Sequence, residues 1–508
     1  MERLAFIVSL TLFVVLNSCI FGTHANESSP IYYQHSNGKI STKKEESNND
    51  NSNNNNNNSN NKIVTVHDIE ILRASERLAL IEIYTETQGE KWRDNAKWLN
   101  GDPCVNNWYG VTCNAMNLVT AIQLAANQVN GTIPDIFQQF TQLTVLDLSL
   151  NYLKGAAPPS ITSLVLLEEV DLGYNYLLMS MSLFSGMKQL EKLCLRWNTL
   201  ITGSLHAIKN LKKLHTLSLR DNHMESLTLE GIEQLTSLKY VDLTKSGLRG
   251  ELKPKYLHNL VTFHASNNRL SGSIFSQMGT EERNDEYSLD ALKELDVAFN
   301  TLSGPIPRMI QAKNLEKLDL SNNRFYQCNF VLSDHEKLTS LKMNSNRLEQ
   351  PFFYNFYMMK NIEEFECSHC HLNGVISMPK DHVFKYLKIF NVYNNQLTGQ
   401  LPSALWNMKA LEVLDVSNNQ LSGEISSKIG QLTALSTVRL HFNQFSGSIP
   451  IEFSMLIGLE TLRLVSSLIN FTCLLSHTTE VTQLTHKRIL PSFSLYLFQR
   501  STINLLVR

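Results

Sequence analysis

Two cysteines and two histidines lie close together in the chain, at Cys367, His369, Cys370 and His371. A Cys-x-x-Cys pair beside imidazoles is the kind of cluster that binds zinc or carries out redox chemistry. A tetrahedral cysteine-rich zinc site needs a second such pair, and the sequence contains none. We therefore predict no metal site, no redox centre and no cofactor here.

Six aspartates occupy one position of a short sequence that recurs along the chain. Paired carboxylates are the usual acid and base of hydrolases, so the row raises the question of catalysis. Repetition brings such residues together simply by stacking, and we interpret them as a solvated row. The sequence shows no Ser/His/Asp arrangement, phosphate-binding loop or metal set, and we predict that the protein is not an enzyme. The aspartates are Asp147, Asp171, Asp242, Asp296, Asp319 and Asp415.

The recurring sequence has the form LxxLxLxxNxL, as in Leu143–Leu153 and Leu411–Leu421. Its four apolar positions are apolar in every copy, although hydrophobic residues make up only 43% of the chain. Self-similarity at a fixed period of about two dozen residues is the signature of a solenoid. The copies begin at Val119, Leu143, Leu167, Leu190, Leu214, Leu238, Leu260, Leu292, Leu315, Leu338, Ile362, Leu387, Leu411, Leu435 and Leu459.

The LxLx spacing has period 2, so each copy predicts a short strand with leucines on one side. A single strand of this kind cannot bury its apolar side alone, whereas stacked copies form one core beneath a parallel sheet. The ninth position is usually Asn, which we expect to turn inward and bond backbone groups freed at the end of each strand. Cys367 falls on an inward leucine position and Cys370 on the Asn position.

The second half of several copies carries a Gly-x-x-Pro sequence, as in Gly131–Pro134, Gly304–Pro307, Gly399–Pro402 and Gly447–Pro450. With this Gly-x-x-Pro motif and the LxxLxLxxNxL copies, the chain resembles the plant-type leucine-rich-repeat family. The resemblance implies an α/β repeat fold, a right-handed solenoid with a concave parallel sheet and a convex face that is irregular or 3-10 helical. It also implies an extracellular recognition module, as in receptor ectodomains or polygalacturonase-inhibiting proteins.

The residues before the first copy look like the N-terminal cap of the same family. Apolar residues from Glu76 to Thr87 suit a short amphipathic helix, and Trp92, Trp98 and Trp108 follow it. The resemblance implies a disulfide between Cys104 and Cys113. Such a cap would cover the leucines that the first coil otherwise exposes.

The N-terminus reads as a secretory signal, with Arg3 before an apolar run and Ala25 at a suitable cleavage position. We therefore expect an extracellular, secreted or cell-surface protein without a transmembrane helix in the mature chain. Glycosylation sequons at Asn130 and Asn470 fit export. The predicted segments are a signal peptide (1–25), a disordered Asn-rich leader (26–70), a cap (71–118), about fifteen repeats (119–468) and a divergent tail (469–508).

Outward positions of the strands line the concave face and meet any ligand first. Aromatic and arginine side chains are the usual anchors of protein interfaces. Five such residues on consecutive copies are our candidate contact patch: Tyr174, Arg196, Trp197, Arg220 and Tyr240. A second candidate group comprises Tyr393, Arg439, His441 and Arg463.

Cys194 also takes an outward position, and we expect a solvent-facing thiol there. About eight extra residues around Thr280 to Tyr287 predict a surface loop.

A net charge of −2 argues against a nucleic-acid binder, which usually carries a clear basic excess. The sequence therefore predicts a module that binds a protein or peptide ligand, with a membrane co-receptor as a further partner. The alternative is a structural or adhesive protein whose repeats serve only as a spacer. Fold analogy does not name the ligand.

Overall fold

The computed structural model describes residues 65–274, 288–307, 312–329, 334–352, 356–379 and 384–464. The predicted signal peptide, the Asn-rich tract, the loop at Thr280 to Tyr287, the sequon at Asn470 and the tail lie outside these residues. The chain divides into two units, Met1–Glu70 and Ile71–Arg508. The structure describes only residues 65–70 of the first unit, and the fold is that of the second unit.

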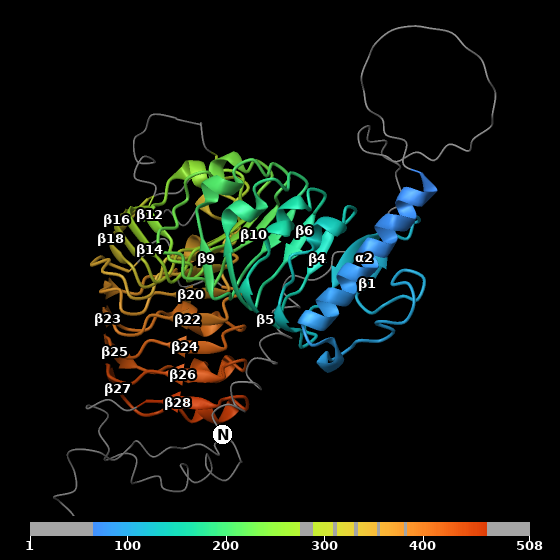
Figure 1. Ribbon diagram of the computed structural model, residues 1–508. Coiled ribbons are helices and arrows are strands. Elements are labelled where there is room, and N and C mark those ends of the chain that lie inside the picture. Colours follow the sequence, from blue (N-terminus) through green and yellow to red (C-terminus); the bar gives the residue numbers. More distant parts are fainter. Residues whose placement is uncertain are drawn as a thin grey trace, which may run out of the picture. The chain divides into compact units, whose positions relative to one another are not determined.

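The second unit is built on one 16-stranded sheet, whose strands after the first pair in parallel (Figure 1). One strand follows the start of each of the fifteen sequence copies, so the solenoid fold is confirmed. In sheet order the strands are β1 (Val111–Cys113), β2 (Val119–Gln123), β4 (Val145–Asp147), β6 (Glu169–Asp171), β8 (Lys192–Cys194), β10 (Thr216–Ser218), β11 (Tyr240–Asp242), β13 (Thr262–His264), β15 (Glu294–Asp296), β17 (Lys317–Asp319), β19 (Ser340–Lys342), β20 (Glu364–Glu366), β22 (Ile389–Asn391), β24 (Val413–Asp415), β26 (Thr437–Arg439) and β28 (Thr461–Arg463).

Three smaller parallel sheets, which the repeat pattern did not predict, flank the large one. Within the described residues, twelve of the coils add a second short strand after the inward Asn position, and these strands pair along the stack. The flank strands are β3 (Asn130–Thr132), β5 (Tyr152–Ala156), β7 (Tyr176–Ser180) and β9 (Leu200–Thr202); β12 (Arg249–Glu251), β14 (Arg269–Ser273), β16 (Thr301–Ile306) and β18 (Arg324–Cys328); and β21 (Asn373–Val375), β23 (Gln396–Gly399), β25 (Gln420–Glu424) and β27 (Gln444–Ser446).

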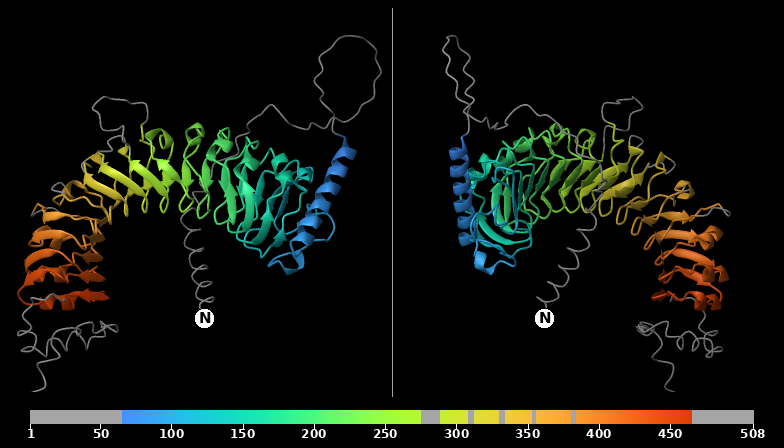
Figure 2. Two further views of the ribbon diagram at one scale, coloured as in Figure 1. Left: turned by 60° about the vertical axis from the view of Figure 1, so that its left-hand side comes forward. Right: turned by 90° about the vertical axis from the view of Figure 1, so that its right-hand side faces the viewer.

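Short 3-10 helices close the coils on the side away from the large sheet, as predicted for the convex face (Figure 2). Pro402 immediately precedes one of them, and its extended φ of −65° starts the turn without an N–H donor. These helices are η2 (Phe137–Gln139), η3 (Pro159–Ser163), η4 (Met181–Phe184), η5 (Leu205–Ile208), η6 (Ile232–Gln234), η7 (Pro254–Tyr256), η11 (Phe356–Met358), η12 (Ser403–Asn407), η13 (Ser427–Gln431) and η14 (Ile451–Met455).

The inward leucines form one continuous core along the stack. Leu146, Leu193 and Leu217 are each completely buried, and Phe263 and Phe365 take the same inward position on later coils. Cys367 and Cys370 are also completely buried, as their places in the repeat predict. Because each coil covers the apolar side of the next, burial in this fold depends on the register between coils.

The inward asparagines tie each coil to the one before it. Asn151 donates through Nδ2 to the carbonyls of Leu124 (2.8 Å) and Leu148 (2.9 Å), and its Oδ1 accepts from the backbone N–H of Asn127 (3.0 Å) and Val129 (2.9 Å). The predicted structural role of these residues is thus observed. Cys370 substitutes in this position by donating its thiol to the Met343 carbonyl at 3.1 Å.

The cap begins with helix α2 (Val66–Glu86), which starts before the segment boundary predicted at residue 71 and before the expected helix start at Glu76. Its Leu80 and Ile83 are buried, but Leu78 is 64% exposed and does not belong to the inner face. A 3-10 turn, η1 (Gly89–Lys91), follows. Trp92, Trp98 and Trp108 are buried, and the ring centroid of Trp98 lies 4.8 Å from that of Trp92 and 5.0 Å from that of Trp108.

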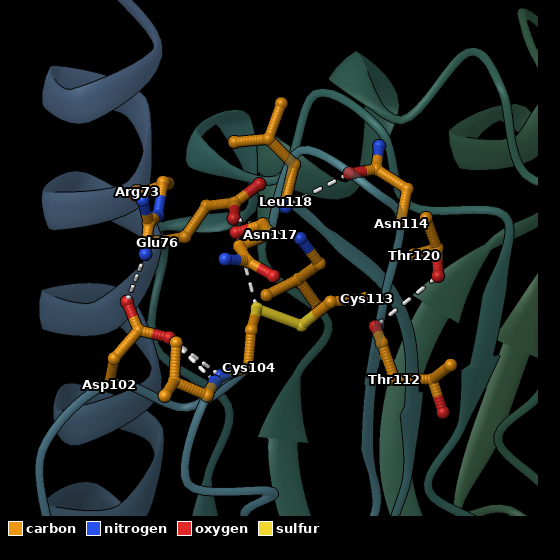
Figure 3. The surroundings of a disulfide bond; sticks show 12 residues. Arg73, Glu76, Asp102, Cys104, Thr112, Cys113, Asn114, Asn117, Leu118 and Thr120 are labelled. Carbon is orange, nitrogen blue, oxygen red and sulfur yellow. Dashed lines mark hydrogen bonds and ion pairs between the residues drawn. A yellow bond between two sulfur atoms is a disulfide. The ribbon is translucent and has the colours of Figure 1, made fainter.

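A disulfide joins Cys104 to Cys113, with 5.7 Å between their Cα atoms (Figure 3). Cys113 ends β1, which pairs with β2 in the antiparallel direction and connects the cap to the first parallel strand. Arg73 of α2 binds Asp102 at 3.0 Å, and Asp102 accepts hydrogen bonds from the backbone of Cys104 and Val105. Helix, disulfide loop and first coil are therefore linked by polar contacts as well as by the tryptophans.

Candidate functional site

The five residues of the aromatic–arginine patch (Tyr174, Arg196, Trp197, Arg220 and Tyr240) occupy two kinds of position. Tyr240 is the first residue of β11, and its side chain is 43% exposed. Arg196 and Arg220 each follow the end of a strand by two residues. Tyr174 and Trp197 were expected at outward strand positions, but they lie in the turn just before the inward Asn.

This turn position has left-handed backbone geometry in every coil where it is described, with φ between 51° and 58°. Residues other than Gly, Asn and Asp rarely adopt this region because Cβ approaches the following carbonyl. Main-chain hydrogen bonds to the next coil impose this geometry. Examples are the bonds from the Tyr174 N–H to the Arg196 carbonyl (2.7 Å) and from the Trp197 N–H to the Arg220 carbonyl (2.9 Å). Large side chains at this position are therefore held on a fixed backbone beside the large sheet.

Tyr174 and Trp197 form the centre of the patch. Their rings stack with centroids 5.9 Å apart and planes 13° apart, while the Arg196 guanidinium carbon lies 5.3 Å from the Tyr174 centroid. Trp197 remains 45% exposed despite these contacts. A rigid, half-exposed aromatic pair with an adjacent guanidinium loses little conformational entropy when a partner binds.

Carboxylates hold the two arginines of the patch in place. Arg196 lies 3.8 Å from Asp171, and Arg220 lies 3.1 Å from Asp221 and 3.7 Å from Asp242. Burial raises the pKa of Tyr174, so its phenol stays neutral and can donate a hydrogen bond. The Nε atom of Arg196 is buried and has no hydrogen-bond partner among the described residues.

The aspartate row is a structural feature and not simply a solvated one, which corrects the sequence interpretation. Each aspartate accepts a hydrogen bond through Oδ1 from the backbone N–H two residues later, for example Gly173 to Asp171 (3.0 Å) and Ser417 to Asp415 (3.1 Å). Asp171 and Asp415 are only 8% and 6% exposed. Burial raises the pKa of Asp171, with the Arg196 charge acting against it. The row therefore ends the strands and anchors arginines.

The prediction of a solvent-facing thiol at Cys194 is wrong. The residue does point outward from β8, but it is only 4% exposed. Lys192, Arg196 and Asp171 surround it, and burial raises its pKa to about 12. A thiolate is the reactive form of cysteine, so this group is chemically inert near neutral pH.

The cysteine–histidine cluster separates in the structure. Cys367 and Cys370 face the core, and burial raises the pKa of Cys367 well above its usual value. His369 and His371 lie on the surface in left-handed turns, with φ of 54° and 57°. Among the residues that the structure describes, no group of three His, Cys, Asp or Glu side chains is placed to hold a metal ion.

The second candidate group does not form one cluster around His441. Arg439 binds Asp415 at 3.3 Å, and burial lowers the pKa of His441. Tyr393 instead packs edge-on against His369, with ring centroids 4.9 Å apart. These residues lack the stacked, half-exposed core that distinguishes the aromatic–arginine patch.

Asn130, the predicted glycosylation site within the described residues, begins flank strand β3. Its side chain is partly exposed, and no hydrogen bond of its amide group is found among the described residues. Glycosylation there stays a prediction.

The cap contains a buried acid that sequence reasoning missed. Glu76 of α2 is 1% exposed; its Oε2 accepts from the Val119 N–H at 2.9 Å, while its Oε1 has no partner among the described residues (Figure 3). Burial raises the pKa of Glu76 from 4.5 to about 7, and the nearby Asp102 charge adds to the rise. The signal for its burial in the sequence was its position among the apolar residues of the predicted helix.

We expect the Glu76→Gln variant to lose a pH dependence of stability that the natural chain has. Between pH 4.5 and about 7 the folded state holds a proton that the unfolded state releases, so stability falls as pH rises through this window. The loss is on the order of 2–3 kcal/mol. Urea denaturation at pH 5 and pH 8 measures it, with the exposed Glu82→Gln on the same helix as control. Equal pH dependence in both variants would contradict this account of the cap.

Comparisons with known proteins agree with the repeat architecture. A family model described as "Leucine Rich Repeat" matches residues 314–334, 386–408 and 410–432. The chain is similar to Receptor-like protein 35 of Arabidopsis thaliana, 28% identical over 167 residues that cover 32% of this chain and 16% of that protein. Receptor-like kinase TMK2 of Arabidopsis thaliana is 25% identical over 327 residues, covering 63% of this chain and 28% of the kinase. The chain thus aligns with less than a third of either relative.

Solved structures give the same result for the fold. The plant peptide hormone receptor RGFR1 in complex with RGF2 has a TM-score of 0.64 and 28% identity, covering 72% of this chain and 61% of the receptor. PEPR1 with AtPEP1 has a TM-score of 0.57 and 24% identity, covering 78% of this chain and 52% of that one, and shows the fold alone. Within the described residues no helix has the length and apolarity to cross a membrane. The registered repeats, the parallel sheet and these matches support a plant-type leucine-rich-repeat family for this chain.

Proposed function

We propose that this protein is an extracellular recognition module that binds a peptide or protein ligand on the exposed face of its large sheet, as a receptor-like or inhibitor-like protein. The observation that carries the proposal is the stacked Tyr174–Trp197 pair with Arg196 over the tyrosine ring. Its exposed area is aromatic, rigid and edged by guanidinium groups, which are the properties of binding hot spots. The protein acts by binding and not by catalysis.

The comparisons support the proposal at the level of ligand class. RGFR1, which shares 28% identity with this chain, is a peptide hormone receptor in complex with RGF2. The curated relatives are named as receptor-like proteins and kinases, which supports a place at the cell surface. A membrane co-receptor is part of the proposal as a further partner. A spacer or adhesive protein, the alternative function, would need no anchored aromatic pair at one place on the sheet.

Affinity capture from extracellular fluid tests the proposal. The mature chain, immobilised at its C-terminal end, is expected to retain a specific peptide or protein that free chain in solution displaces. A parallel capture with the chain unfolded in urea and bound to the same support controls for adsorption. A spacer function predicts that no component is retained by the folded chain and released by competition.

A further inference from the structure

A second hollow lies where the coils of β17 to β20 leave the large sheet, away from the aromatic–arginine patch. It has a volume of about 620 Å3, within the range of roughly 300–1,000 Å3 that small-molecule sites occupy. Its lining contains two arginines and two histidines but no carboxylate. The lining residues are Asn323, Arg324, Tyr326, Ser345, Asn346, Arg347, His369 and His371.

The repeat brings three of these basic side chains side by side. Arg324, Arg347 and His371 each follow the inward residue of their own coil, and the coils are consecutive. Main-chain hydrogen bonds fix the register of these coils. The Arg347 N–H donates to the Phe325 carbonyl (2.8 Å), and the Leu348 N–H donates to the Cys370 carbonyl (3.1 Å). Neighbouring strands are about 4.8 Å apart, so each of the three side chains starts about one strand spacing from the next.

Of the two guanidinium groups of this hollow, one is paired with a carboxylate and the other is not, within the part of the chain that the structure describes. Arg347 uses Nε to bind Glu349 at 2.5 Å, which leaves both of its Nη groups available. Arg324, Tyr326 and His371 show no side-chain hydrogen bond or ion pair among the described residues. Asn323 and Asn346, in contrast, donate hydrogen bonds from their side-chain amides to backbone carbonyls and form the wall of the hollow.

Another hollow, of about 390 Å3 on the large sheet, is lined by charged side chains that neutralise one another. There Glu294 binds Lys317 at 2.9 Å and His264 at 3.4 Å, and Lys342 binds Glu364 at 3.0 Å. The charged side chains of this hollow pair with one another, without a ligand. At the hollow of Arg324 and Arg347, Arg347 binds one carboxylate, Glu349, and Arg324 has no carboxylate partner among the described residues. Neighbouring guanidinium charges repel each other unless an anion lies between them.

We propose that the hollow lined by Arg324, Arg347 and His371 binds an oxyanion group, a sulfate, phosphate or carboxylate. Two guanidinium groups offer paired N–H donors that match the oxygens of such a group. The Tyr326 and Ser345 hydroxyls add neutral donors from the same lining. The group is either a free inorganic ion or an acidic side chain of a bound peptide. This proposal is independent of the proposed function, because it concerns another surface.

Isothermal titration calorimetry at constant ionic strength tests the site in the full chain. One arm uses inorganic sulfate, and the other uses a short blocked peptide with one Glu and its Gln counterpart. We expect saturable one-to-one binding in at least one arm, with a Kd on the order of 1 mM for so small a ligand. Binding of sulfate alone assigns the site to a free oxyanion, and preference for the Glu over the Gln peptide assigns it to a peptide carboxylate.

Variants distinguish this site from general attraction to positive charge. The double variant Arg324→Ala/Arg347→Ala should weaken binding at least tenfold. Arg249→Ala/Arg269→Ala removes the same charge from register-paired residues of a flank sheet outside the hollow and should change affinity less than twofold. Thermal melts verify that both variants fold. Absence of saturable binding in both arms, or equal losses in the two double variants, would overturn the proposal.

Discussion

The double variant Trp197→Ala/Arg220→Ala is expected to lower affinity for the captured partner roughly 100-fold, because truncation of hot-spot residues costs about 2–4 kcal/mol. Trp197 provides exposed aromatic area, and its loss also frees the Tyr174 ring that stacks on it. Arg220 is positioned by Asp221 and Asp242, so its removal leaves two carboxylates facing the ligand. Surface plasmon resonance with the purified partner measures the change.

Phe299→Ala is the matched control for this variant. Phe299 occupies the same left-handed turn position as Trp197 on another coil, with φ of 53° and 53% of its surface exposed. Its replacement removes an aromatic ring from the same kind of backbone without touching the patch. Similar losses of affinity in both variants would mean that aromatic area anywhere along the coils is sufficient, and the patch would lose its special role.

Asn151→Ala is expected to be the most destabilising single substitution considered, by about 3–5 kcal/mol. It removes donors to the carbonyls of Leu124 and Leu148 and leaves the N–H groups of Asn127 and Val129 without their acceptor. The side chain is 4% exposed, so water cannot easily replace these bonds. Each buried backbone group left unpaired costs roughly 1–3 kcal/mol.

Urea denaturation followed by circular dichroism measures this loss. Asn210→Ala serves as the control, since Asn210 is exposed and its side chain makes no hydrogen bond among the described residues. Because coils contact only their neighbours, hydrogen exchange should show the loss of protection concentrated in the first coils. A change below about 1 kcal/mol would show that the inward asparagines do not hold the coils together.

The interior could be predicted from the sequence because its rule repeats in every copy. Period-2 leucines fix which side of each strand faces inward, and the polar groups freed at the strand end leave Asn as the suitable inward residue. The same rule predicted that Cys367 and Cys370 lie in the core and do not form a metal site. Both are completely buried, and Cys370 takes over one Asn hydrogen bond.

Outward positions were harder to interpret, because their exposure depends on neighbouring coils. Cys194 points outward but is covered by charged side chains of β8, of the preceding coil and of its own turn. Asp171 was expected to be solvated, yet it ends its strand by accepting the Gly173 N–H. An aspartate followed two residues later by a small residue was the signal for this turn, and it is visible in the sequence.

Backbone geometry accounts for the remaining differences. The left-handed turn places Tyr174 and Trp197 beside the strands and not on them. The signal for this geometry in the sequence was asparagine at the same position of other coils, namely Asn267, Asn322, Asn394 and Asn418. The flank sheets arise from segments with too few residues to show a strand pattern of their own. Gly304, with φ of 86°, lies within β16 and shows how glycine lets such a strand pass through a region that other residues avoid.

Hydroxyl-radical footprinting of the chain with and without its captured partner tests the central claim most directly. Binding on the large sheet predicts that oxidation of Tyr174, Trp197 and Tyr240 slows several-fold, while the exposed flank residue Tyr152 reacts as before. Unchanged oxidation of the three patch residues in a saturated complex would contradict the account.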